Sequence, residues 1–261
     1  MFNRGLAPIS DETWKEIEDR LMEVFKSHLS ARKVVKVVGP KGLDYNVISE
    51  GRLEEIHEEG ELFYANYKVT PLTEVRVEFE LDKWELDNVL RGAKDVDYEP
   101  LEEAAKKIAL FEESVIYNGS DKLNIKGLVK SSAHEMLEFG NDQESILDSI
   151  ANGIIKLRES YQEGPFVLVV GKEAFRRIVS KGEGYSLRDK IESLTGHKIV
   201  YSHVLDGAVL VPYDHEDLEL TIGQDLDIGY QSYDNNKIRF FITESFTFRV
   251  LDPTIIVSYK L

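Results

Sequence analysis

The segment between residues 46 and 81 constrains the fold most, because it predicts long strands that have little of their own to bury. Residues 74–81 alternate strictly between charged and apolar side chains, which is typical of a strand with one buried face. The apolar positions are Val75, Val77, Phe79 and Leu81. Residues 62–69 are also strand-like, and the run 53–61 before them is rich in glutamate. A two-stranded ribbon is not stable alone, so we expect this one to lie on another surface, in this chain or in a neighbouring one.

Two long amphipathic helices are predicted around this ribbon. Residues 11–29 carry apolar side chains every three or four positions, with Ser10 or Asp11 as the N-cap. Pro100 opens a second helix with a long apolar face, and Gly119 ends it. Such faces are typical of helices that pack on their own core. In the first helix, part of the apolar stripe could instead stay open as a groove for a partner.

The second half of the chain predicts a mixed arrangement of helices and strands. Asn141 or Asp142 caps a third helix, and the wholly apolar residues 166–170 form a strand buried on both faces. Helices over 172–179 and 187–194 flank a polar loop, and residues 218–257 are mostly strand. We see no internal repeat and no linker, so any domains are interleaved.

The sequence shows no catalytic constellation and no metal site. None of the six histidines has the H-x-x-x-H spacing of a helical zinc pair, and His134-Glu135 lacks the second histidine. There is no G-x-S-x-G elbow and no phosphate-binding loop. The chain has no cysteine, which excludes disulfides and thiolate ligands. We therefore expect no catalytic residue, no metal and no required cofactor.

Charge and hydropathy limit the kinds of partner. The 32 basic and 48 acidic residues give a formal net charge of −16, which repels phosphate backbones. The sequence has no signal peptide and no apolar run long enough for a membrane span. We therefore expect neither a nucleic-acid partner nor a membrane partner, and the lack of cysteine fits a reducing compartment. If many copies assemble, apolar contacts and salt must outweigh the charge repulsion.

Several short motifs, in one order along the chain, resemble the encapsulins, a family of shell proteins. Each motif is weak alone, and their collinearity carries the resemblance. The motifs are Leu6-Ala7-Pro8-Ile9 with Trp14, Gly39-Pro40, Trp84-Glu85-Leu86-Asp87-Asn88, Glu163-Gly164-Pro165, Gly223-Gln224-Asp225-Leu226 and Phe241-Ile242-Thr243-Glu244.

The resemblance implies an α+β fold, which is the major capsid fold of tailed bacteriophages, of the Hong Kong 97 type. It implies a discontinuous peripheral domain over residues 1–45, 71–125 and 225–261. Residues 46–70 would be an extended hairpin loop, and residues 126–224 an axial domain. The ribbon would then lie on a neighbouring subunit, which explains why it has so little to bury.

The resemblance also implies a function and candidate sites. Encapsulins form icosahedral compartments in the prokaryotic cytoplasm and enclose cargo, such as a dye-decolorising peroxidase or a ferritin-like iron-storage protein, through its C-terminal targeting peptide. The candidates for binding that peptide are Phe25, Leu29, Arg32, Leu226, Ile228 and Tyr230. The candidates for a loop lining the five-fold pore are Lys181, Gly182, Glu183, Gly184 and Tyr185. Some members bind flavin, for which Arg76 and Trp84 are the candidates.

Three alternatives stay open from the sequence. A viral or prophage major capsid protein would share the fold, but a virus would need a scaffold or a cleaved leader, and we expect none before the first helix. An enzyme would need a catalytic constellation. A monomeric binding module would need a self-covered hairpin and would behave as a particle near the chain mass of 29.8 kDa.

Overall fold

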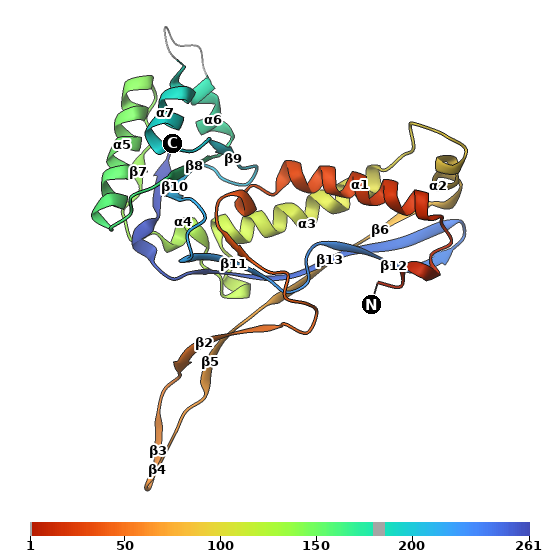
Figure 1. Ribbon diagram of the computed structural model, residues 1–261, viewed down its shortest axis with the longest axis horizontal. Coiled ribbons are helices and arrows are strands. Elements are labelled where there is room, and N and C mark those ends of the chain that lie inside the picture. Colours follow the sequence, from red (N-terminus) through yellow and green to blue (C-terminus); the bar gives the residue numbers. More distant parts are fainter. Residues whose placement is uncertain (1, 180–185) are drawn as a thin grey trace.

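The computed structural model describes residues 2–179 and 186–261 and arranges them around two five-stranded sheets (Figure 1). The first sheet has the order β1-β11-β13-β12, and β6 pairs with the other side of β13. Its strands are β1 (Lys36–Val38), β6 (Thr73–Asp82), β11 (Leu218–Ile222), β12 (Asp227–Asp234) and β13 (Lys237–Val250). The strand β13 is thus the centre of this sheet, and β12 ends it with a free edge.

The helices α1 (Asp11–His28) and α3 (Glu99–Asn118) lie along one face of the first sheet (Figure 1). Both predicted helices are confirmed, and Ser10 is the N-cap of α1, because its hydroxyl accepts a hydrogen bond from the Thr13 N–H at 3.2 Å. The alternation predicted for residues 74–81 is confirmed too, since the apolar side chains of β6 lie under the helices and the charged ones are exposed. Burial of the apolar faces thus holds the two layers together.

A short helix, α2 (Lys83–Leu90), follows β6 directly, and the sequence interpretation did not predict it. Asp82 caps this helix by accepting hydrogen bonds from the N–H groups of Trp84 at 2.8 Å and Glu85 at 3.4 Å. The signal was present, because an aspartate followed three residues later by glutamate is a helix-start pattern. Strict alternation up to Leu81 hid it.

The second sheet has the order β7-β14-β10-β8-β9, with α5 (Gln143–Glu159), α6 (Lys172–Val179) and α7 (Leu187–Thr195) packed around it. Its strands are β7 (Leu137–Glu138), β8 (Phe166–Val170), β9 (Val200–Tyr201), β10 (Ala208–Pro212) and β14 (Val257–Lys260). The short helix α4 (Gly127–Ser131) leads into this part of the chain. Every residue of β8 is buried, as predicted, and Asp142 caps α5. Apolar side chains of both sheets meet in one shared core cluster.

A narrow hairpin projects away from the two sheets (Figure 1). Its base is the antiparallel pair of β2 (Val47–Leu53) and β5 (Tyr67–Pro71), and its tip is the pair of β3 (His57–Glu59) and β4 (Leu62–Tyr64). Nearly all its residues are exposed, including the apolar ones. The hairpin therefore finds no cover within its own chain.

Two strands lie in a different sheet from the one that the expected domain ranges imply. The strand β11 falls within the expected axial range 126–224 but pairs with β1 and β13 in the first sheet. The strand β14 falls within the expected peripheral range 225–261 but pairs with β7 and β10 in the second sheet. The chain therefore passes between the sheets more often than a division into contiguous ranges implies.

Candidate functional site

The structure gathers the apolar candidate residues at the join of α1 and β12. Phe25, Leu29 and Ile228 are buried members of one core cluster, and Leu226 and Tyr230 pack against that cluster while staying partly exposed. The sequence brought these residues together only through a family resemblance, because about 200 residues separate the two groups. In this conformation only Leu226 and Tyr230 present apolar surface to a partner.

Arg32 lies just after α1, in a 3-10 turn (Ala31–Lys33), and its guanidinium contacts three carboxylates. It donates to both oxygens of Glu112, to Asp225 Oδ1 at 2.7 Å and to Glu244 Oε2 at 3.2 Å. Glu112 and Glu244 are fully buried. Arg32 was expected to be available for a polar contact with a bound peptide, but its hydrogen bonds already join α1, α3, β13 and the loop before β12.

Burial disfavours a negative charge on one member of this cluster. Burial and the adjacent Glu112 carboxylate raise the pKa of Glu244 well above its usual range. A buried cluster of this kind is costly to break, because loss of one partner leaves another charge unpaired.

A second buried carboxylate lies one residue away. Glu113 accepts hydrogen bonds from the Ala31 N–H at 2.6 Å and from the Ser30 hydroxyl, and Ser30 Oγ lies 3.0 Å from Tyr117 Oη. Burial raises the pKa of Glu113 to about 7. The turn after α1 is therefore attached to α3 by a carboxylate that titrates near neutral pH.

The N-terminal residues lie on the free edge of β12, and the sequence interpretation missed this contact. The Tyr230 N–H donates to the Phe2 carbonyl at 2.8 Å, and Arg4 Nε donates to the Ile228 carbonyl at 3.0 Å. The Arg4 guanidinium also pairs with Asp227 at 2.5 Å and with Glu18. Nothing in the sequence pattern pairs residues so far apart.

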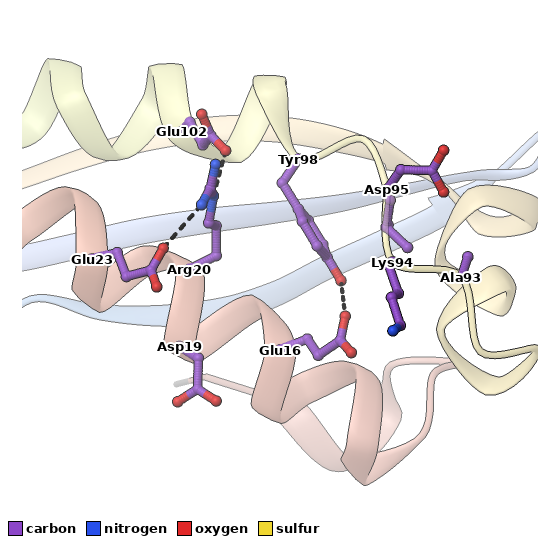
Figure 2. Close-up of a pocket in the computed structure, with 10 residues that line it drawn as sticks. Glu16, Asp19, Arg20, Glu23, Ala93, Lys94, Asp95, Tyr98 and Glu102 are labelled. Atoms are coloured by element: carbon purple, nitrogen blue, oxygen red, sulfur yellow. Dashed lines mark hydrogen bonds and ion pairs between the residues drawn. The ribbon is translucent and has the colours of Figure 1, made fainter.

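An open polar depression of about 600 Å³ lies between α1 and the loop before α3 (Figure 2). Arg20 bridges Glu23 at 2.9 Å and Glu102 at 2.5 Å, and the Tyr98 hydroxyl donates to Glu16 at 3.0 Å. These ion pairs are exposed to solvent. The depression is therefore a solvent-exposed, salt-bridged surface.

The two flavin candidates do not form one site. Trp84 is at the start of α2, two thirds exposed, with the Arg91 guanidinium 5.8 Å from its ring centre. Arg76 lies over the Phe241 ring at 4.2 Å. The six residues from Arg76 to the end of β6 span roughly 20 Å of strand. The two side chains therefore do not meet in one flavin site within this chain.

The pore-loop residues Lys181, Gly182, Glu183, Gly184 and Tyr185 lie outside the described residues. Within residues 2–179 and 186–261, no group of three or more histidine, aspartate or glutamate side chains is placed to hold a metal ion. In the same part of the chain, no helix is long and apolar enough to cross a membrane.

Comparison with solved structures defines the class of the fold. The structure matches a virus-like particle from Pyrococcus furiosus with a TM-score of 0.69 at 16% identity, over 93% of this chain and 97% of that one. It matches the capsid of an empty GTA particle with a TM-score of 0.59 at 12% identity, over 89% of this chain and 96% of that one. The chain has the capsid fold of the Hong Kong 97 type, as the resemblance implied.

Sequence comparison then gives the family. A family model described as "Encapsulating protein for peroxidase" matches residues 1–247. The type 1 encapsulin shell protein of Rhodococcus erythropolis is 34% identical over 258 residues, which cover 98% of each chain. The chain belongs to the encapsulin family of shell proteins, and its role is structural rather than enzymatic.

Proposed function

We propose that this chain assembles with copies of itself into a closed icosahedral shell in the prokaryotic cytoplasm, and that the shell encloses a peroxidase. The family description supports the choice of cargo. Shell formation is supported by the fold and by the uncovered hairpin. A viral or prophage capsid protein is the alternative, and it differs in having a genome rather than an enzyme inside the shell.

The projecting hairpin carries the proposal. Seven of its large apolar side chains are about half to three quarters exposed. They are Leu53, Ile56, Leu62, Phe63, Tyr64, Tyr67 and Val69. So many exposed apolar side chains on one narrow ribbon are typical of a protein interface and are costly to leave in water. A neighbouring subunit is the occupant that fits, because the same chain supplies both hairpin and cover in a closed symmetric shell.

The domain roles are part of this proposal. Residues 1–45, 71–125 and 225–261, apart from β14, would form the peripheral domain. Residues 126–224, apart from β11, would form the axial domain together with β14. The pairing of these two strands across the expected boundaries supports a rigid subunit, since the sheets share a core cluster.

Cargo would dock through a C-terminal peptide on the partly exposed surface of Leu226 and Tyr230. Phe25, Leu29 and Ile228 support that surface from below, and Arg32 fixes the turn beside it. Extended peptides gain specificity by placing alternate side chains in pockets, and these residues form an apolar surface beside a strand edge. Ferritin-like cargo would use the same surface, and identification of the enclosed protein distinguishes the two.

Assembly is tested by expressing the chain alone and measuring particle mass by light scattering, with electron microscopy of the product. We expect closed uniform particles of megadalton mass. Phe63→Asp should leave the subunit folded but reduce assembly, because it places a charge in the proposed interface. Glu58→Gln, in the same hairpin tip, is the matched control. A species near 30 kDa for the unaltered chain at every salt concentration would refute the proposal.

Cargo docking is tested in the native host. Shells purified with their contents should contain a peroxidase by mass spectrometry, and Tyr230→Asp should give intact shells with less of it. Tyr230 is preferable to Ile228 here, because a charge at the fully buried Ile228 would destabilise the subunit itself. Unchanged loading of Tyr230→Asp shells would place the docking site elsewhere, and nucleic acid inside the shells would favour the viral alternative.

A further inference from the structure

The free edge of β12 presents a short row of backbone groups that point away from the sheet. The Ile228 N–H is satisfied by the Asp227 carboxylate at 2.8 Å, the Ile228 carbonyl by Arg4 Nε, and the Tyr230 N–H by the Phe2 carbonyl. Only one of these three bonds is made by backbone of another segment. An irregularity after Tyr230 in the pairing with β13 ends the row. The edge could therefore pair with a further strand, but side chains now make most of its hydrogen bonds.

The segment that covers this edge is not itself a strand. It contains a 3-10 turn (Arg4–Leu6), and Asn3 before that turn adopts a left-handed conformation with φ of 48°. The ring of Phe2 stacks on Phe241 at 6.1 Å. Leu6, by contrast, is about 70% exposed. The segment is thus attached at its start through Phe2 and Arg4, and Ile9 at its end packs against the core beside α1.

We propose that the free edge of β12 is a strand-addition site for an extended peptide, and that Phe2 and Arg4 occupy it until the peptide displaces them. This inference rests on the proposed function, because the cargo peptide is the extended segment that the site would take. Strand addition would replace the side-chain contacts at Ile228 and Tyr230 with regular backbone hydrogen bonds, which is how sheet edges commonly bind peptides.

The surroundings of the edge specify the chemistry of the peptide. A cavity of about 340 Å³ beside Arg4 is lined by Ile9 and Trp14 and by the charged side chains of Asp11, Lys15 and Glu18, so it offers the added strand both apolar and charged contacts on one side. Departure of Phe2 exposes the Phe241 ring to the other side. Departure of Arg4 uncovers the carboxylates of Asp227 and Glu18. The site therefore favours an extended peptide with apolar residues and one lysine or arginine.

The test uses the chain's own segment as the probe. A fluorescent protein ending in the eight residues Phe-Asn-Arg-Gly-Leu-Ala-Pro-Ile, which are residues 2–9 of this chain, is co-expressed with the shell protein. Fluorescence per subunit is measured in the purified shells. A site already occupied in cis binds the probe weakly, since apparent affinity falls with the fraction of free sites. We expect Arg4→Ala shells to load about fivefold more probe than unaltered shells, because release of the segment frees the site.

Three further variants make the result specific. Phe2→Ala should raise loading as Arg4→Ala does, and it serves if Arg4→Ala shells do not form. Adding Tyr230→Pro to Arg4→Ala should return loading to the unaltered level, since proline has no N–H and is tolerated at a free edge. Lys107→Ala, exposed on α3, is the control and should change nothing.

Equal probe loading in unaltered, Arg4→Ala and Phe2→Ala shells would overturn the inference, as would undiminished loading after Tyr230→Pro. Either result leaves the proposed function standing if the shells form and still enclose native cargo. Failure of the unaltered chain to form shells would instead overturn the proposed function, so the two failures are distinguishable.

Discussion

Replacement of Glu113 by glutamine should change how the stability of this protein depends on pH. Glu113 is fully buried and holds the turn after α1 through the Ala31 N–H and the Ser30 hydroxyl. Burial raises its pKa from 4.5 to about 7. Glutamine keeps an oxygen for the Ala31 N–H, and its amide can donate to Ser30 as a protonated carboxyl would. The variant therefore mimics the protonated state at every pH.

The direction of this change in stability follows from proton binding to Glu113. Between pH 4.5 and about 7 the folded state holds a proton on Glu113 that the unfolded state has lost. Stability conferred by this proton is fully present below pH 4.5 and is lost as the pH rises to about 7. The pKa difference corresponds to about 3 kcal/mol. The free energy of unfolding of Glu113→Gln, relative to the unaltered protein, should therefore rise by about 3 kcal/mol between pH 4.5 and pH 8.

The assay is urea unfolding at several pH values and one subunit concentration, followed by tryptophan fluorescence. Assembly contributes to both proteins alike, so the difference between the two curves isolates Glu113. Glu103→Gln, exposed on α3, is the matched control and should run parallel to the unaltered protein. Parallel curves for Glu113→Gln and the unaltered protein would refute the reasoning, since they would show that Glu113 has the same pKa in both states.

Two further predictions concern packing. Arg32→Met should destabilise the subunit by about 3–5 kcal/mol in urea unfolding, because it leaves buried carboxylates unpaired. Arg20→Met, which breaks only exposed ion pairs, should lower the free energy of unfolding by at most about 1 kcal/mol. Equal losses of stability in the two variants would show that burial of the Arg32 ion pairs adds nothing. Gly153→Ala should cost about 1–3 kcal/mol, because the added methyl group meets the Tyr259 hydroxyl. That buried hydroxyl has no hydrogen-bond partner in the described part of the chain, so Tyr259→Phe should recover part of the melting temperature that Gly153→Ala loses, and no recovery would place the strain elsewhere.

The sequence predicted best those elements whose pattern is local. Strict alternation identified β6, and the regular apolar spacing after Ser10 identified α1. The run 166–170 identified a buried strand from composition alone. In α1 and β6 the burial of one face produces a period in neighbouring residues, which can be read without knowing the partner. In β8 both faces are buried, and the continuous apolar run indicates this without a period.

The contacts that build the candidate site could not be predicted in this way. Arg32 pairs with Glu112 and Glu244, which lie 80 and 212 residues further along the chain. Any of the 48 acidic residues could have been its partner by sequence. The contact of Arg4 with β12 spans 224 residues, and no pattern in the sequence indicates it either. Family resemblance supplied the positions of Leu226 and Tyr230, but the structure was needed to show which candidates are buried.

The place of β14 in the second sheet has a consequence for biosynthesis. The strand lies between β7 and β10, and β7 pairs with no other described strand. Yet β14 is translated after every other described element. The second sheet therefore stays incomplete until β14 has left the ribosome, even though α5 and β8 emerged long before. Chains interrupted before β14 would keep this sheet open between β7 and β10.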